Sequence, residues 1–184
     1  MIRSRLSIAA IAGVALILFG VLVAAVIAMP LEFNPSLSMP IGVYERFSLD
    51  AHPLTRGTLV DACMPAWAVS YRKRITEPLP PGPCPGNTAM VLKYVAGIPG
   101  DRITVRADGV LVNGYKWKNT APAARSHSGF ALPHMFLGRT ITLARGRYWL
   151  LTSVADGFDS RYWGPSTQIM YRMRPLLILP DFPK

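Results

Sequence analysis

Residues 89–112 read AMVLKYVAGIPGDRITVRADGVLV, and this stretch predicts the fold class. Its first part, residues 89–96, is a continuous apolar run of strand length, which is typical of a buried β-strand. The Pro-Gly pair that follows stands where a type II turn places these residues. Residues 102–106 alternate between polar and apolar side chains, and the Asp-Gly pair after them is a favoured hairpin turn. The stretch therefore predicts strands joined by tight turns.

The chain after Tyr44 has the same organisation and almost no helical periodicity. A proline-rich segment, residues 77–86, predicts a surface loop, because proline suits neither a helix interior nor a central strand. Residues 116–138 predict a long excursion, and residues 153–164 a loop. Further strands are expected at residues 57–60, 141–143, 148–151, 169–173 and 176–179. Many short strands with regular turn signals indicate a mainly β domain, either a barrel or a folded sheet.

The N-terminus carries a long apolar run, residues 6–29, behind the basic residues Arg3 and Arg5. As a helix this run would extend about 36 Å, enough for a hydrocarbon core of about 30 Å. A cleaved signal peptide has a shorter apolar region, although small residues near the end of the run leave cleavage open. Because basic residues favour the cytoplasmic side, we expect residues 1–29 to form a cytoplasmic N-terminus and one transmembrane helix. Residues 30–184 would form the domain outside.

The net charge of +10 leaves three classes of partner open: nucleic acid, anionic lipid headgroups and acidic substrates. The basic residues are scattered and show no interleaving with aromatic residues, so we expect a lipid bilayer and no nucleic acid. Ser38 follows Pro30 by eight residues, which reach at most about 28 Å when extended. Ser38 is therefore expected near the membrane surface, where a membrane-anchored substrate can reach it.

Two cysteines, Cys63 and Cys84, form an even pair in a domain that we take to be exported. An oxidising compartment favours a disulfide, which would add about 3 kcal/mol in the chain-entropy model; two reduced, buried thiols are the alternative. We expect no metal, because no histidine or further cysteine lies at ligand spacing, and no organic cofactor.

Ser38 and Lys93 are the candidate catalytic residues. A serine hydroxyl needs a base to become a nucleophile, and lysine can serve only when burial lowers its pKa enough to leave it neutral. Lys93 stands among apolar neighbours in the strand predicted at residues 89–96; the alternative is an edge-strand lysine with its ammonium in water. In an extended chain the Ser36 hydroxyl would point the same way as Ser38 and could face a carbonyl oxygen, as an oxyanion hole requires.

A histidine-based triad is the obvious alternative. His52, His127 and His134 all lie outside the apolar strands, and none is beside a candidate acid. We therefore interpret them as solvated loop residues. In the run from Asp159 to Arg161, the carboxylate and the guanidinium could pair and brace the site, although most such pairs lie at the surface.

Three segments resemble the conserved boxes of the type I signal peptidase family, the serine–lysine peptidases of the S26 kind. They are Ser36–Pro40 (SLSMP), Lys93–Asp101 (KYVAGIPGD) and Phe158–Gly164 (FDSRYWG), in the family's order and after an apolar N-terminus. The compact first box and the two-cysteine loop are most similar to the conjugative-transfer, TraF-type branch.

The resemblance implies a signal-peptidase-like folded β-sheet or barrel and a serine endopeptidase held in the bacterial inner membrane, with its catalytic domain in the periplasm. It makes Ser38 the nucleophile, Lys93 the general base and Ser36 the hydroxyl that assists the oxyanion hole. Asp159, Ser160 and Arg161 fall on the last box and would support the site. The implied substrate is a membrane-anchored precursor, a pilin-like subunit of the conjugation machinery, with cyclisation after cleavage in some systems.

Two alternatives stay open: a general signal peptidase that serves many secreted proteins, and a non-catalytic membrane-anchored assembly module. The sequence also departs from the family at Gly157, where many members have a serine that orients the lysine. Ser153, Asp156 and Asp159 are the candidates to orient Lys93 instead, unless the amine is left less constrained, and we expect Asp159 to do so.

Overall fold

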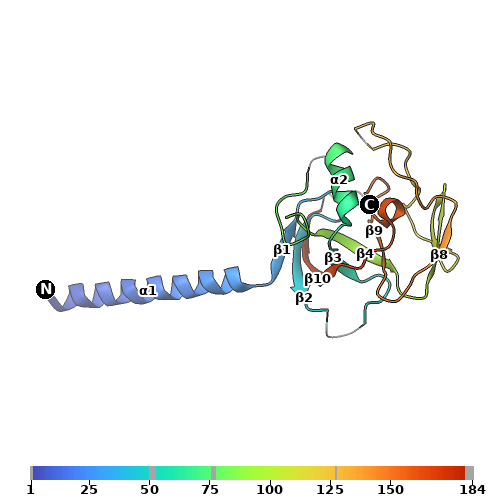
Figure 1. Ribbon diagram of the computed structural model, residues 1–184. Helices are drawn as coiled ribbons and strands as arrows, with labels where there is room; N and C mark the ends of the chain where they lie inside the picture. Colours follow the sequence, from blue (N-terminus) through green and yellow to red (C-terminus); the bar gives the residue numbers. More distant parts are fainter. Residues whose placement is uncertain (1, 50–52, 76–77, 127, 181–184) are drawn as a thin grey trace. The chain divides into compact units, whose positions relative to one another are not determined.

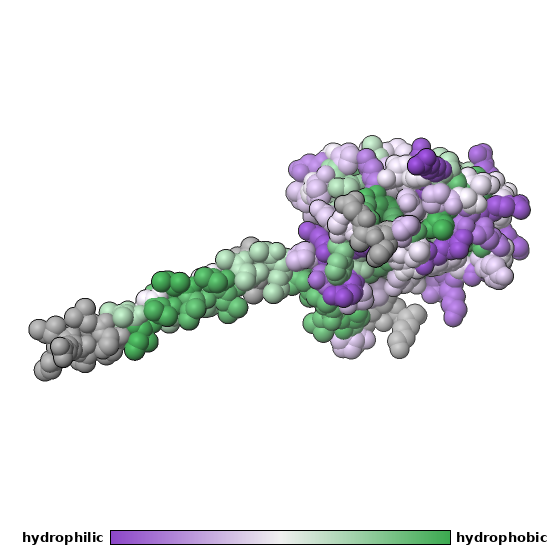
Figure 2. All heavy atoms as spheres, turned by 90° about the horizontal axis from the view of Figure 1, so that it is seen from below, coloured by the Kyte–Doolittle hydropathy of each residue, from purple (hydrophilic) through white to green (hydrophobic). Residues whose placement is uncertain are grey.

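The computed structural model describes residues 2–49, 53–75, 78–126 and 128–180, and it divides the chain into two units, Met1–Leu31 and Glu32–Lys184. The first unit is a single helix, α1 (Ile2–Ala28). Its described side chains are mostly exposed and apolar, as the space-filling view in Figure 2 shows. Over the described residues, none of the helices meets the length and hydropathy that a membrane crossing needs. The helix predicted at residues 6–29 is present, and its crossing of a membrane stays a prediction.

The second unit is mainly β, as predicted. Its larger sheet has six strands in the order β1-β2-β10-β3-β4-β9 (Figure 1). The pairings of β10 with β2 and β3, of β3 with β4 and of β4 with β9 are antiparallel. The strands are β1 (Leu31–Asn34), β2 (Gly42–Phe47), β3 (Leu59–Ala62), β4 (Val91–Gly97), β9 (Trp149–Leu151) and β10 (Ile169–Ile178).

A smaller antiparallel sheet has the order β7-β6-β5-β8, and β8 lies at the far end of the domain from β1 and β2 (Figure 1). The predicted Asp-Gly hairpin joins its two central strands, where Val105 pairs with Val110. The Pro-Gly turn before this hairpin is also present, closed by the Asp101 amide, which donates to the Ile98 carbonyl. The strands are β5 (Arg102–Arg106), β6 (Gly109–Val112), β7 (Tyr115–Lys116) and β8 (Thr140–Thr142).

Two helices of the domain were not predicted. Helix α2 (Ala66–Ile75) lies between the strand expected at residues 57–60 and the loop expected at residues 77–86, where no element was assigned, and α3 (Ser160–Trp163) is one turn inside the expected loop 153–164. On α2 the spacing of Ala68 and Ile75 gives an apolar face, but a charged residue between them interrupts the pattern. Helix α3 depends on its cap, the carboxylate of Asp159, which accepts a hydrogen bond from the backbone N–H two residues later.

Strand β4 is buried on both faces, as its apolar run predicted. Leu92 packs with Met39 and Leu59 on one face, and Val95 packs with Val60 and Leu150 on the other. A disulfide joins Cys63 to Cys84, so α2 lies within a covalently closed loop beside this strand. Lys93 thus stands on an inner strand whose two faces are both packed against other residues.

Candidate active site

Ser36 and Ser38 lie in the turn between β1 and β2. The turn is organised by Asn34, whose side-chain amide donates to the carbonyls of Met39 and Pro40 and whose oxygen accepts from the Ser36 amide. The two serine hydroxyls are 2.8 Å apart, and the Ser38 amide donates to Ser36 Oγ at 3.3 Å. The hydroxyls do converge, but through a turn, closed by the Met39 amide on the Ser36 carbonyl, and not through the extended strand on which the expectation rested.

Asn34 was missed by the sequence analysis. The Asn-Pro pair at residues 34 and 35 was the available signal, because such a pair favours the start of a turn.

Lys93 is 3% exposed, and its Nζ donates to the Leu92 carbonyl at 3.0 Å. Burial lowers the pKa of this ammonium to about 8; the charges of Arg72 and Arg161 act in the same direction, and that of Asp159 acts against it. The alternative of a solvated edge-strand lysine is excluded, because β4 lies between β3 and β9. A lysine with this pKa is neutral in a large fraction of molecules just above neutral pH, as a general base must be.

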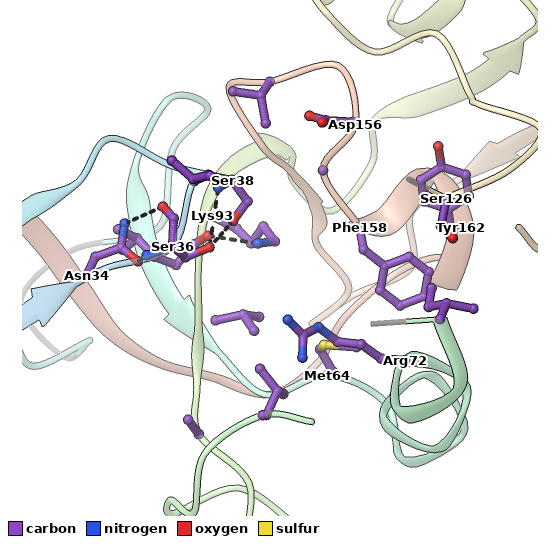
Figure 3. A pocket seen from close by; sticks show the side chains of 18 of the residues that line it. Asn34, Ser36, Ser38, Met64, Arg72, Lys93, Ser126, Asp156, Phe158 and Tyr162 are labelled. Carbon is purple, nitrogen blue, oxygen red and sulfur yellow. Dashed lines mark hydrogen bonds between the residues drawn. The ribbon is translucent and has the colours of Figure 1, made fainter. Parts of the chain in front are cut away.

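Ser38 and Lys93 face the same cavity, which has a volume of about 820 Å³ (Figure 3). In the part of the chain that the structure describes, Ser38 Oγ bonds to Ser36 and Lys93 Nζ to the Leu92 carbonyl, so no hydrogen bond joins the two side chains directly. Side-chain rotations within the cavity are needed to bring them together. The cavity is also lined by apolar side chains, which include Phe33, Leu37, Met64, Ile75, Leu79, Val91, Leu92 and Phe158.

The last box forms a buried brace beside the cavity. Asp159, Ser160 and Arg161 are at most 1% exposed. The Asp159 carboxylate accepts from the Arg161 guanidinium at 2.7 and 2.8 Å and from the amide and hydroxyl of Thr152. Ser160 Oγ accepts from the amide of Leu150 on β9. These bonds fix the loop after β9, which forms one wall of the cavity.

The hydrogen bonds of Asp159 do not support the expectation that it orients Lys93. Its carboxylate bonds to Thr152 and Arg161, and within the described residues it acts on Lys93 through its charge alone. The carboxylate bonds to a guanidinium in preference to an ammonium because the guanidinium offers several donors in a planar fork, whereas the ammonium is a point charge.

The departure at Gly157 has a direct structural correlate in Thr152, which the sequence analysis missed. A Cβ atom at position 157 would lie 2.1 Å from Thr152 Oγ1 and 2.6 Å from its methyl group. Thr152 directly follows β9, whose Leu151 pairs with Tyr94, the neighbour of Lys93 on β4. The space that a serine side chain at position 157 would need is therefore filled by threonine.

A second buried acid, Asp61 on β3, was also missed. Burial, and then a hydrogen bond with Glu32, raises the pKa of Asp61 to about 8, while Glu32 pairs with Arg46 at 2.5 Å. The available signal was an isolated carboxylate inside the apolar run of residues 59–62.

The histidine alternative gains no support. His52 and His127 lie outside the described residues. His134 packs its ring against the edge of Tyr162, with the centroids 6.2 Å apart, and among the described residues it is not one that lines the cavity of Ser38.

The domain is antiparallel β, and a buried lysine and a serine line one of its cavities. This combination is typical of serine–lysine hydrolases, so the chain is compared with proteins of that class. Residues 2–170 match the family model described as signal peptidase, peptidase S26, and the chain belongs to this family. The chain is 31% identical over 149 residues to the plasmid transfer protein TraF of Escherichia coli, across 79% of this chain and 82% of that protein. It is 31% identical over 132 residues to the conjugal transfer protein TraF of Agrobacterium fabrum, across 72% of each. The predicted resemblance to the family and to its TraF-type members is confirmed.

Among solved structures, a signal peptidase I from Enterococcus faecalis aligns with a TM-score of 0.38 at 18% identity, over 67% of this chain and 98% of that chain.

Proposed function

We propose that the chain is a membrane-anchored serine endopeptidase in which Ser38 is the nucleophile and Lys93 the general base. The observation that carries this proposal is the burial of Lys93 in the cavity that Ser38 also lines. Burial of an ammonium is costly unless its charge is compensated or its pKa is lowered. A catalytic role for the neutral Lys93 amine explains why the lysine is buried despite this cost.

In the first step Lys93 Nζ takes the proton of Ser38 Oγ, which attacks the carbonyl carbon of the scissile bond. The negative charge that develops on the carbonyl oxygen is stabilised by the Ser38 amide and the Ser36 hydroxyl. The protonated Lys93 then gives its proton to the leaving amine, which leaves an acyl ester on Ser38. Water or an amino group of the substrate attacks this ester, and the two outcomes are hydrolysis and cyclisation.

The hydrogen bonds that Ser38 and Lys93 make in this structure determine which side chains must rotate when a substrate binds. Ser36 Oγ has to release Ser38 Oγ, and Lys93 Nζ has to turn from the Leu92 carbonyl toward the serine. Both rotations leave the backbone in place, because Asn34 holds the turn and β4 is paired on both sides.

The substrate in this proposal is a membrane-anchored precursor protein, a pilin-like subunit of a conjugation system. The names of the TraF relatives, which are plasmid and conjugal transfer proteins, support a place in the transfer machinery. The apolar surface of α1 supports an anchor in the bacterial inner membrane, with the N-terminus in the cytoplasm and the β domain in the periplasm. The disulfide supports the periplasm, since such bonds persist in oxidising compartments.

The test is the intact mass of a candidate pilin co-expressed with the wild-type protein, Ser38→Ala or Lys93→Ala. We expect shortening with the wild type alone, and a further loss of about one water mass if the product is cyclised. Ser70→Ala and Lys116→Ala are matched controls, because both residues are exposed and neither lines the cavity. Processing by Lys93→Ala would refute the dyad.

Two other outcomes separate the remaining functions. Many unprocessed precursors after depletion of the protein would identify a general signal peptidase, which membership of the signal peptidase family favours. Normal pilin assembly with Ser38→Ala would identify a non-catalytic assembly module.

A further inference from the structure

Asp61 is a buried acid to which the chemistry above gives no role. It stands on β3 opposite Leu92, the residue before Lys93 on β4, and it is 1% exposed. Its Oδ2 atom is buried, and among the described residues no hydrogen-bond donor reaches that atom. An ionised carboxylate in such a place would be costly. The group must therefore have a compensating cation or keep its proton.

Asp61 faces a second carboxyl group, that of Glu32 on β1, with which it shares a hydrogen bond. The Glu32 carboxylate also accepts from Arg46 on β2, from Nε at 2.8 Å and from Nη2 at 2.5 Å. The Arg46 guanidinium lies over the ring of Tyr171, which is the register partner of Asp61 on β10. The nearby guanidinium is thus already bonded to Glu32.

A hydrogen bond between two carboxyl groups requires a proton on one of them, because two close carboxylates do not both ionise readily. Glu32 is the better site for the negative charge, since it is bonded to the guanidinium and 26% of its side chain is exposed. Asp61 is the buried partner, and burial together with Glu32 raises its pKa to about 8. At neutral pH Asp61 is therefore a neutral acid that donates to Glu32.

This hydrogen bond connects the two sides of the proposed catalytic site. Glu32 lines the cavity and stands two residues before Asn34, so both side chains lie on the same face of β1. Asn34 holds the turn that carries both serines (Figure 3). On the other side, β3 is paired with the strand of Lys93. In the sheet order β2 and β10 stand between β1 and β3, so side chains make this connection.

The charge of Asp61 also acts on Lys93. Lys93 Nζ donates to the Leu92 carbonyl, and an ionised Asp61 raises the pKa of the ammonium through space. A proton on Asp61 thus favours the neutral amine that a general base requires, and its loss favours the ammonium. Further charges that act on Lys93 come from three residues that the experiments below leave unchanged, Asp159, Arg72 and Arg161.

We propose that Asp61 is a positioning residue of the serine–lysine site: as a neutral acid it joins the strand that leads to Ser38 to the strand beside Lys93, and it leaves no negative charge near that amine. Glu32 keeps the proton on Asp61, because it is both the acceptor and the neighbouring negative charge. The role in catalysis rests on the proposed function, whereas the effect on the charge of Lys93 does not.

The first test measures the titration of Lys93 without any substrate. The full-length protein in detergent is labelled with a trace of acetic anhydride at several pH values, and the acetylation of each lysine is quantified by mass spectrometry of its peptides. Because the neutral amine is the nucleophile, the pH midpoint of labelling reports the pKa of Lys93. The exposed Lys118 is the internal reference.

Glu32→Gln is expected to raise the Lys93 midpoint by roughly one pH unit, because the new amide can donate to an ionised Asp61 and so removes its proton. Adding Asp61→Asn should abolish this shift, since no charge is then left at position 61. The matched control is Glu45→Gln, which should leave the midpoint unchanged. Glu45 pairs with Arg174 on the same sheet and is not among the described residues that line the cavity.

An unchanged midpoint in Glu32→Gln would overturn the proposal, because Glu32 would then have no control over the charge near Lys93. A shift that persists in the Glu32→Gln, Asp61→Asn double variant would also overturn it, since the effect would not pass through Asp61. This test uses no Asp61→Leu protein, so it decides the proposal even where that variant fails to fold.

The second test is the rate at which a candidate pilin is shortened, followed by intact mass. Asp61→Leu removes the hydrogen bond and is expected to lower the rate about tenfold. Asp61→Asn should retain most of the rate, because its amide can still donate to Glu32. Equal rates for the two variants would overturn the positioning role. The expected shift of the Lys93 midpoint without cleavage by the wild-type protein would keep the link between Asp61 and Lys93 and refute the peptidase; an absence of both would overturn both.

Discussion

The pKa of Lys93 makes a prediction about stability that is independent of any substrate. Burial lowers this pKa from 10.5 to about 8 in the folded protein, while the unfolded chain keeps a value near 10.4. Between these two values the unfolded state binds more protons, so the stability that Lys93 contributes rises with pH. It is fully present above about pH 10.5 and is lost as the pH falls toward 8. Below about pH 8, the buried Lys93 ammonium lowers the free energy of unfolding by about 3 kcal/mol.

Replacing Lys93 by methionine removes the ammonium and keeps a side chain of similar length. Because apolar replacement of a buried charge is often neutral or stabilising, we expect Lys93→Met to be inactive and yet more stable than the wild type by up to about 3 kcal/mol near pH 6. The advantage should shrink steadily between about pH 8 and pH 10.5, the window in which the folded and unfolded states differ in charge.

The assay is unfolding by urea in detergent, monitored by tryptophan fluorescence and repeated at several pH values across this range. Ser38→Ala is introduced into both proteins so that self-cleavage cannot affect the result. Other titrating groups, including Asp61, are common to the two proteins and largely cancel in the difference. A stability difference that stays constant with pH would refute the reasoning, because it would mean that Lys93 titrates normally in the folded state.

Three further substitutions test the surroundings of the site. Gly157→Ser should lower the free energy of unfolding by about 1–3 kcal/mol, measured by chemical denaturation, because its Cβ would collide with Thr152; unchanged stability would show that the two segments separate freely. Arg161→Met should cost about 3–5 kcal/mol in the same measurement, because it leaves the buried Asp159 carboxylate without its cation, and a loss as small as that of a surface pair would contradict the brace. Cys63→Ser should lower the thermal midpoint by an amount equivalent to about 3 kcal/mol, and reductant should then have no further effect on the variant.

Much of the fold was predictable because the responsible signals are local. The apolar run that became β4, the alternation of β5 and the turn before β6 are each contained in a few neighbouring residues. The short helices were not, because their stability comes from contacts outside the segment. In α2 the apolar face is interrupted by Arg72, which faces a cavity and not a core. Helix α3 exists because Asp159 caps it from a brace that includes Thr152.

The sequence by itself determined the β character of the domain, the family and the identity of Ser38, Lys93 and the two cysteines as residues of interest. Periodicity, turn chemistry and motif spacing are properties of the chain alone. Only the tertiary structure decided that Lys93 is buried, since this depends on β3 and β9 arriving on either side of β4 from distant parts of the chain. It also decided that the Asp159 carboxylate pairs with Arg161, and that Arg72 lines the cavity. A side chain's charge and partners follow from what surrounds it in space, and sequence order does not contain that information.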